Sequence, residues 1–371
     1  MKIGILTFHS QLNYGGVLQC WALQTVLEKL GHEVVVIDRE FEHQIRSCMA
    51  VFKGWGMKHW VRFAIGLLRP SPGCLRVLRY LRTVRFARNK LHLTPYSFKY
   101  WKDAPVNLGV DLIIVGSDQV WNAVWNDLDV YTLENAPDVL AIGYAISLGM
   151  TSLPSDSIQK YAVAAKRFSS VSVRETESIL LLQSVGIKST HVSDPTLLVS
   201  YPDVKRSTNG GLVCYFIDSC LLNQETIELL DEFRRKTGIT VQMFTQKLPQ
   251  SAINSKGIRM RYSAGPLEFL KAIANAKYVV SDSFHALMFA CVFGKPISLV
   301  HPGESQRKHM FSRIREFSES YVKGKCIYKN IGEVLDAIIA GSTIEYDYSG
   351  IEMFKTDSLQ CLEQAIGSVR K

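Results

Sequence analysis

The residues best placed for chemistry lie where a short apolar strand gives way to an apolar helix. The run from Tyr278 to Ala290 begins with β-branched residues, continues through Ser281, Asp282 and Ser283, and puts His285 in the first helical turn. Backbone N–H groups at a helix start attract anions, and small polar side chains cap them. This pattern predicts an acid or base histidine beside a phosphate or carboxylate. The alternative is a half-buried histidine that hydrogen-bonds a carbonyl group.

A glycine-containing loop follows the first expected strand. It runs from His9 to Gly16 and leads into a helix near Val17. Glycines let a ligand approach the backbone closely. The loop matches neither a Walker loop nor the dinucleotide-binding pattern, and a tight turn without a ligand is the alternative. We expect substrate contacts here from Asn13, Tyr14, Gly15, Gly16 and Gln19.

Polar and aromatic groups also follow the strand that ends at Val115. They are a carboxylate, two amides and an indole, contributed by Asp118, Gln119, Trp121 and Asn122. Such a set can orient sugar hydroxyls by hydrogen bonding and stacking. The alternative is a capped helix start with a buried tryptophan.

An arginine emerges at the end of another expected strand. Arg174 follows Val173, and Glu175 and Glu177 come with the next helix. A guanidinium group there can clamp a carboxylate or phosphate with two parallel hydrogen bonds. The alternative is a structural ion pair with Glu175 or Glu177.

Strand-like and helix-like segments alternate along the chain, which predicts parallel β-sheets. Because 371 residues exceed the usual size of one hydrophobic core, we expect two domains. The boundaries are an N-terminal α/β domain at 1–199, a C-terminal α/β domain at 212–345 and a helical tail at 346–371. Ligands bind beyond the carboxyl ends of such strands, so the loops above are expected to face a cleft between the domains.

Composition excludes several classes of protein. The chain is 47% hydrophobic, which is typical of a globular protein, and no apolar run is long enough to cross a bilayer. Residues 1–8 predict a strand and not a signal peptide, because polar residues follow at once. The eight cysteines include no Cys-x-x-Cys pair. We therefore expect reduced thiols in a cytoplasmic protein, with no metal site.

One long stretch is strongly basic. No acidic residue lies between Glu42 and Asp103, whereas 13 of the 43 lysines and arginines lie there. The cations are mixed with aromatic residues, which suits an anionic membrane surface bound through residues 46–102, or a large phosphorylated substrate. The alternative is a solvated basic hairpin, because the arginines recur every third residue and spiral around a helix. No nucleic-acid-binding motif accompanies the charge, so nucleic acid is not an expected partner.

Five motifs stand in order along the chain. They are Asn13-Tyr14-Gly15-Gly16-Val17-Leu18-Gln19, Gly116-Ser117-Asp118-Gln119-Val120-Trp121-Asn122, Ser172-Val173-Arg174-Glu175, Ser193-Asp194-Pro195 and Ser281-Asp282-Ser283-Phe284-His285-Ala286. Together they resemble the polysaccharide pyruvyl transferase family over about residues 1–320. The resemblance implies two Rossmann-like α/β domains in a GT-B-like fold, with a basic helical insertion at about 43–102. It also implies transfer of the enolpyruvyl group of phosphoenolpyruvate onto a sugar as a pyruvate ketal.

The resemblance further implies roles for individual residues. Arg174 and His285 match the donor-site arginine and histidine of the family, and Lys308 or Arg313 would add a donor-site cation. His285 would act as the general acid, and Asp118 is the candidate base for the acceptor. We expect Arg174→Ala to abolish transfer while the fold stays intact.

Phosphoenolpyruvate would be a co-substrate, and no cofactor is expected. Because it carries two anionic ends, cations should dominate its pocket, and the helix start at Ser281 and Ser283 should receive its phosphate. The acceptor would be a lipid-linked oligosaccharide of capsule or exopolysaccharide synthesis, reached at the inner membrane face. Deleting residues 46–100 is expected to remove membrane binding and spare the donor site. Two alternatives are a GT-B glycosyltransferase or sugar-nucleotide epimerase, and a non-catalytic scaffold at the membrane surface.

Overall fold

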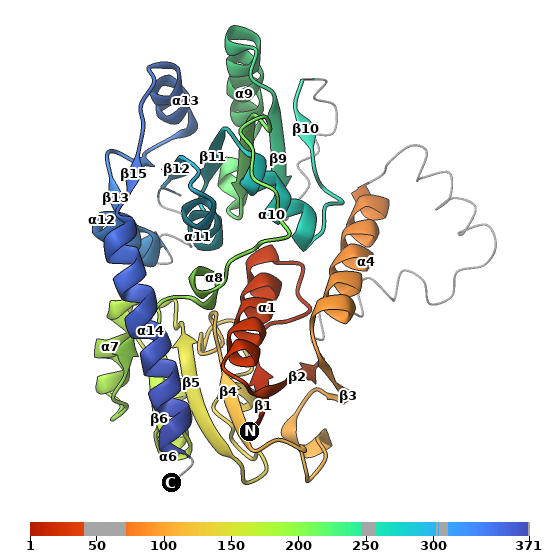
Figure 1. Cartoon of the computed structure of the whole chain (residues 1–371), viewed down its shortest axis with the longest axis vertical. Helices are drawn as coiled ribbons and strands as arrows, with labels where there is room; N and C mark the ends of the chain where they lie inside the picture. The colour runs from red at the N-terminus through yellow and green to blue at the C-terminus, as the bar shows by residue number, and fades with distance from the viewer. Residues whose placement is uncertain (41–71, 246–256, 302, 304–310, 370–371) are drawn as a thin grey trace, which may run out of the picture.

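Two α/β domains, each built on a parallel β-sheet, make up the protein (Figure 1). The computed structural model describes residues 1–40, 72–245, 257–301, 303 and 311–369. The candidate Lys308 and the first part of the basic stretch, at 46–71, therefore lie outside the described residues.

The first sheet contains seven strands in the order β3-β2-β1-β4-β5-β6-β7, all parallel. Its strands are β1 (Lys2–Leu6), β2 (Glu33–Arg39), β3 (Leu93–Phe98), β4 (Leu112–Val115), β5 (Leu140–Ile146), β6 (Ser170–Val173) and β7 (Thr190–His191). The accompanying helices are α1 (Tyr14–Lys29), α4 (Pro72–Lys90), α5 (Leu128–Tyr131), α6 (Ile158–Arg167), α7 (Thr176–Gln183) and α8 (Pro195–Leu198). The order reverses between β1 and β4, where open α/β sheets bind ligands.

The second sheet repeats this plan with six strands, in the order β10-β9-β8-β11-β12-β14. Its strands are β8 (Leu212–Phe216), β9 (Val241–Thr245), β10 (Arg259–Met260), β11 (Tyr278–Ser281), β12 (Ile297–Val300) and β14 (Ile327–Tyr328). The helices are α9 (Gln224–Thr237), α10 (Pro266–Asn275), α11 (Phe284–Phe293), α12 (Ser312–Tyr321) and α13 (Ile331–Ile339), and β13 (Val322–Lys323) pairs with β15 (Glu345–Tyr346). The predicted pair of Rossmann-like sheets is confirmed.

The strands form because their apolar runs are buried on both faces. Ile5 pairs with Val36 on one side and Ile114 on the other, and none of the three has exposed surface. Such continuous β-branched runs are typical of parallel sheets covered by helices on both faces. No helix in the described part of the chain is long and apolar enough to cross a membrane.

The last helix, α14 (Tyr348–Ser368), returns from the C-terminal domain to the N-terminal one. It passes beside α12 and then runs along the flank of the first sheet near β5 and α8 (Figure 1). Ser358 Oγ accepts a hydrogen bond from the backbone N–H of Ser193 at 2.8 Å. The helix of the tail is therefore attached to a loop next to Asp194.

The described end of the basic stretch is part of the fold. In α4, the buried Arg79 donates to the carbonyl oxygens of Leu12 at 2.7 Å and Thr245 at 2.6 Å, one in each domain. Its guanidinium group also lies 4.3 Å from the centre of the Tyr14 ring. Because α4 is followed by β3, a deletion of residues 46–100 would remove a sheet strand and this interdomain contact. The expectation that such a deletion spares the donor site conflicts with this geometry.

Candidate active site

An arginine and a histidine from different domains meet at the cleft. Arg174 follows β6, and His285 lies in the first turn of α11. Arg174 Nη1 is 3.5 Å from His285 Nε2, and both residues are buried. Because the two side chains touch, a donor must bind beside this pair and not between its members.

Two aspartates hold the guanidinium group of Arg174. Nη2 donates to Asp118 Oδ1 and Nη1 donates to Asp194 Oδ2, each at 2.8 Å. Asp194 Oδ2 also lies 3.7 Å from His285 Nε2, and Glu175 Oε2 lies 3.9 Å from Arg174 Nε. The Arg174 side chain has 0% exposure. The charge of Arg174 is thus balanced by protein carboxylates. This agrees with the structural ion pair that the sequence offered as an alternative, but Asp118 and Asp194 lie closer to the guanidinium group than Glu175 does.

These contacts keep both aspartates ionised. Burial opposes the charged form of Asp118, but the charges of Arg174, His285 and Arg313 outweigh burial and lower its pKa. Burial also opposes ionisation of Asp194, and the hydrogen bond and charge of His285 with the charge of Arg174 lower its pKa well below the ordinary value. A carboxylate stabilised in this way is a weak base.

Two helix N-termini converge on the imidazole ring of His285. Asn13 caps α1 by accepting from the N–H of Gly15 at 3.1 Å, and Ser283 caps α11. A Cβ on Gly15 would lie only 2.1 Å from His285 Nδ1, so the start of α1 abuts the ring. Positive helix ends and uncapped N–H groups favour an anion at this place.

Arg313, near the start of α12, supplies a second cation. Its Nη1 donates to Ser147 Oγ at 3.1 Å. In the amide orientation that satisfies both partners, Gln119 accepts from Arg313 Nη1 at 2.7 Å and from Nη2 at 2.8 Å. Arg313 forms no ion pair with a carboxylate of the described residues, and burial with the charge of Arg174 lowers its pKa to about 10, so it remains charged at neutral pH. It is therefore the site cation with charge left for a donor.

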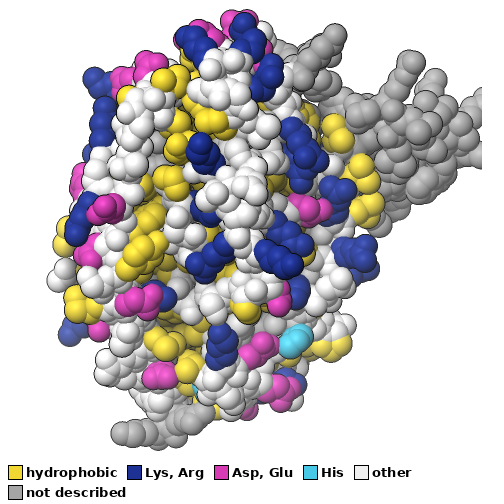
Figure 2. Space-filling view, turned by 45° about the horizontal axis from the view of Figure 1, so that its top comes forward, with side chains coloured by type: hydrophobic (Ala, Val, Ile, Leu, Met, Phe, Trp, Pro, Cys, Tyr) yellow, Lys and Arg dark blue, Asp and Glu magenta, His cyan; other side chains and the backbone are white. Residues whose placement is uncertain are grey.

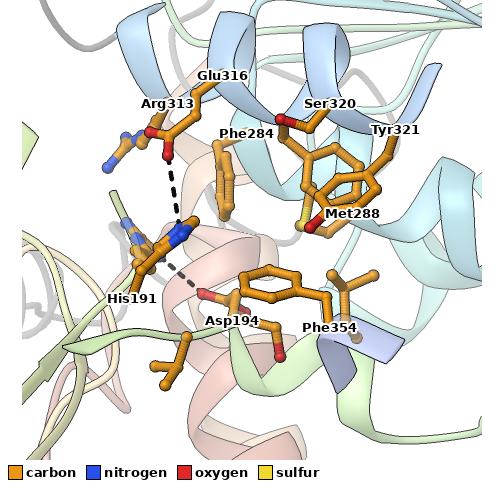
Figure 3. Close-up of a pocket in the computed structure, with 14 residues that line it drawn as sticks. His191, Asp194, Phe284, Met288, Arg313, Glu316, Ser320, Tyr321 and Phe354 are labelled. Carbon is orange, nitrogen blue, oxygen red and sulfur yellow. Dashed lines mark hydrogen bonds and ion pairs between the residues drawn. The ribbon is translucent and has the colours of Figure 1, made fainter. Parts of the chain in front are cut away.

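A narrow cavity borders the charged cluster formed by Arg174, Asp194 and Arg313 (Figure 3). Asp194 and Arg313 lie at its charged end, and apolar side chains that include Phe284 and Met288 form the rest. His191 Nε2 lies 3.7 Å from Glu316 Oε1 and so links the two domains beside it. The cavity holds about 20 Å³, which suits one water molecule and not a three-carbon phosphate.

Three predicted substrate contacts lie in the interior. Tyr14 stacks on Phe269 at 4.6 Å and donates to the carbonyl of Ala264. Gln19 donates to three oxygens of its own domain, and Trp121 is fully buried with its indole N–H on the carbonyl of Tyr131. The polar groups of Tyr14 and Trp121 are thus paired, whereas Gln19 Oε1 is buried and accepts no hydrogen bond from the described residues. All three side chains pack the interior, and the acceptor contacts expected of them stay a prediction. The burial of Trp121 matches the buried-tryptophan alternative.

The serines before His285 organise the backbone. Ser281 Oγ donates to the carbonyl of Tyr215 and accepts from the N–H of Ser283, and both serines are buried. Asp282 accepts from the N–H groups of Ile217 and Asp218 at 2.7 Å each. These hydrogen bonds form the cap of α11 and the turn that joins β11 to β8. The phosphate contact expected of the two serine hydroxyls stays a prediction.

Asp194, Ser147 and Trp125 take part in or lie near the site although we expected no role for them. Asp194 follows β7 and caps α8, and Ser147 directly follows β5. The rule that placed Arg174 at a strand end would have found both. Among the described residues no group of His, Cys, Asp or Glu side chains is placed to hold a metal ion.

Known structures share this architecture at low identity. The Arabidopsis thaliana protein UGT89C1, complexed with UDP-L-rhamnose, superposes with a TM-score of 0.51 at 10% identity over 99% of this chain and 98% of that one. The UDP-GlcNAc 2-epimerase of Neisseria meningitidis gives 0.49 at 10% identity over 99% and 100%. The glycosyltransferase SnogD of Streptomyces nogalater gives 0.41 at 12% over 100% and 99%. The match to UGT89C1 and the two parallel-sheet domains agree with the predicted GT-B-like fold.

At the level of sequence, no curated protein matches the chain. The profile of the family described as polysaccharide pyruvyl transferase matches residues 13–298, which include Asp118, Arg174, Asp194 and His285. This match covers most of the chain and both sides of the cleft. The protein therefore belongs to the polysaccharide pyruvyl transferase family.

Proposed function

We propose that the protein transfers the enolpyruvyl group of phosphoenolpyruvate to a sugar and forms a pyruvate ketal. Family membership supports a transferase with a sugar or polysaccharide acceptor. The donor assignment depends on the position of His285, at which the N-termini of α1 and α11 meet. Arg313 lies nearby and forms no ion pair with a carboxylate of the described residues. A doubly anionic donor with a basic methylene carbon suits that combination.

The donor would bind beside the Arg174–His285 pair, on the side that Arg313 reaches. Arg174 already satisfies Asp118 and Asp194, so its role in the proposal is to fix those carboxylates and His285. Arg313 would exchange its hydrogen bonds to Ser147 and Gln119 for bonds to the donor phosphate or carboxylate. This corrects the expectation that cations dominate the pocket, because the described cluster holds as many aspartates as arginines.

The proposed reaction uses one proton donor and two sugar hydroxyls. His285 protonates the methylene carbon of phosphoenolpyruvate while the first hydroxyl adds to the carbon that bears the phosphate. Phosphate then leaves with its bridging oxygen, and the second hydroxyl adds to the same carbon and closes the ketal. Each hydroxyl loses its proton to a base, for which Asp118 remains a candidate although its lowered pKa makes it a weak one.

The proposed acceptor is a lipid-linked oligosaccharide of capsule or exopolysaccharide synthesis, met at the inner membrane face. The net charge of +9 supports an anionic surface as partner. On the face drawn in Figure 2, basic side chains lie among acidic and apolar ones and form no unbroken patch. The exposed arginines of α4 are therefore the described residues most suited to lipid contact.

The test is incubation of the full chain with phosphoenolpyruvate and a panel of lipid-linked oligosaccharides. We expect stoichiometric phosphate release and a product heavier by one pyruvate ketal, both lost in His285→Asn. Arg313→Gln should raise the KM for phosphoenolpyruvate by about tenfold or more, because a charge-assisted contact is worth roughly 1.5–3 kcal/mol. Arg315→Gln removes an exposed arginine from the same helix and should change nothing.

The alternatives predict different products. A GT-B glycosyltransferase or epimerase would leave phosphoenolpyruvate intact and act on a sugar nucleotide. A non-catalytic scaffold would show neither turnover nor a thermal shift with phosphoenolpyruvate. Either result would replace the proposal.

A further inference from the structure

A second cavity opens on the N-terminal domain, next to the charged cluster. It lies between the loop after β4, which contributes Asn122, Val124 and Trp125, and the loop after β5, which contributes Gly149, Thr151 and Ser152. Its volume is about 430 Å³, which is in the range of small-molecule binding sites. Both loops follow strand ends at the same edge of the sheet as Asp118 and Ser147, so the cavity faces the cleft.

The cavity presents an aromatic ring to solvent. The side chain of Trp125 is 53% exposed, and that of its neighbour Val124 is 67% exposed. Single exposed apolar residues are common, but here they line a concave surface. An indole ring offers a flat apolar face of the size of a pyranose ring together with a polar N–H.

A buried amide faces the same space. Asn122 is only 2% exposed, and its Oδ1 accepts a hydrogen bond from the N–H of Val124 at 3.0 Å. Among the described residues nothing accepts from its Nδ2, although this residue lines the cavity. The Nδ2 group is therefore able to donate a hydrogen bond to a ligand in the cavity. The hydroxyls of Thr151 and Ser152, both exposed, add donors and acceptors on the opposite wall.

The side chain of Gln119 lies between Gly149, which lines the cavity, and Arg313. The side-chain amide of Gln119 accepts from Arg313 and lies 2.7 Å from the point where a Cβ of Gly149 would be. Gly149 has a φ of +59°, a conformation that favours glycine, and a side chain at this position would collide with the Gln119 amide. A ligand in the cavity would therefore lie one side chain away from the cation that we assign to the donor.

We propose that this cavity binds an uncharged pyranose ring of the acceptor, stacked on Trp125 and hydrogen-bonded to Asn122. None of the described residues that line it carries a charge, which favours a neutral sugar over a uronic acid or a sugar phosphate. The inference rests on the proposed function, because it names the sugar that receives the pyruvate group. The sequence had suggested Trp121 as the residue that stacks on a sugar. The proposal assigns this role to Trp125, four residues further along the chain.

The test measures glycoside binding without phosphoenolpyruvate. Saturation-transfer NMR would be recorded with methyl galactoside, glucoside and mannoside, methyl N-acetylglucosaminide and, as a charged comparison, methyl glucuronide. We expect at least one neutral glycoside to bind with a millimolar Kd and the glucuronide to bind more weakly. Trp125→Ala should raise that Kd about tenfold and Asn122→Ala severalfold, whereas Trp125→Phe should retain most binding.

Leu180→Ala is the control, because Leu180 is 71% exposed on α7 and lines neither cavity. Circular dichroism and urea unfolding would verify that each variant is folded. Absence of neutral glycoside binding to the wild type, or equal binding to Trp125→Ala, would overturn the proposal. If phosphoenolpyruvate yields no product while glycosides still bind through Trp125, the proposed transfer is wrong and the sugar site stands.

Discussion

Arg174 holds together a cluster of buried charges. It bridges Asp118 and Asp194 and touches His285, with no exposed surface of its own. Removing one member of a buried ion cluster leaves the other charges without compensation, which is strongly destabilising. The sequence-based expectation that Arg174→Ala leaves the fold intact therefore conflicts with this geometry.

Arg174→Met should lower the free energy of unfolding by about 3–5 kcal/mol. Urea denaturation at neutral pH measures the change. Adding Asp118→Asn and Asp194→Asn to the same chain removes the uncompensated charges and should recover a large part of the loss. Equal stability of the single variant and the wild type would mean that the cluster contributes nothing to the fold.

Gly15 is required by its contact with His285. In Gly15→Ala the new Cβ would lie 2.1 Å from Nδ1, so the imidazole ring must move. We expect transfer activity to fall by about 100-fold, because small displacements at a reacting group have effects of that size. The measurement is phosphate release from phosphoenolpyruvate.

The matched control for Gly15→Ala is Gly367→Ala. Gly367 is also a helical glycine, in α14, and nothing lies within 4 Å of the position of its Cβ. This control should keep full activity and be slightly more stable, because alanine favours helix. Full activity of Gly15→Ala would contradict the close approach of α1 to the imidazole ring.

Residue types at strand ends were enough to predict that Arg174, Asp118 and His285 lie at the cleft. The same reasoning could not tell Trp121 from Trp125, since burial of an indole depends on packing from distant segments. It left open whether Arg174 is neutralised, and it did not identify the closer partners. That outcome depends on Asp194, which only the fold brings within 2.8 Å.

The connection from β11 to α11 contains a carboxyl group with an unusual titration. Burial raises the pKa of Asp282 to about 6, against the opposing hydrogen bonds from Ile217 and Asp218. A raised pKa means that the folded state binds the proton more tightly than the unfolded chain. This group therefore lowers the free energy of unfolding as pH rises from about 3.9 to about 6, and the reduction persists above that.

Asp282→Asn should remove this dependence. The difference in urea midpoint between wild type and variant is expected to shift in favour of the variant as pH is raised from about 4 to about 7. Asparagine keeps one acceptor oxygen for the turn that joins β11 to β8. A difference that is constant with pH would show that Asp282 titrates normally.

Most elements were predictable from periodicity, and the exceptions have physical reasons. The predicted alternation of strand-like and helix-like segments is present in both sheets, for example from α10 through β11 and α11 to β12. The strand β3 was missed because it contains Pro95 and follows the basic run. Proline is compatible with β3 because this strand lies at the edge of the sheet, where a missing N–H leaves no partner unpaired.

On the scale of the whole molecule, the net charge of +9 favours binding to an anionic membrane surface. Four arginines of α4 are exposed, of which Arg82 donates to Ser263 of the other domain. Changing the other three, Arg76, Arg85 and Arg88, to glutamine removes charge without touching the buried Arg79. We expect the triple variant to bind anionic vesicles more weakly than the wild type by about tenfold or more, since each basic residue near such a surface contributes about 1 kcal/mol. Cosedimentation at low and high salt measures this.

Three exposed lysines of the C-terminal domain provide the matched control: Lys323, Lys325 and Lys329. Their change to glutamine removes the same charge and should leave vesicle binding nearly unchanged. Binding that is insensitive to salt, or equal loss in both triple variants, would contradict a specific lipid-facing role of α4.

The return of α14 to the first domain has a mechanical consequence. The chain crosses between the domains near residues 199–211 and again within α14, and the second crossing is held by the hydrogen bond from the N–H of Ser193 to Ser358 Oγ. Two such crossings define an axis, so we expect the domains to open by a hinge rotation about it and not by a shear motion. Because Arg174 and His285 lie in different domains, opening would separate His285 from Arg174 and Asp194, and closing would bring these side chains together again.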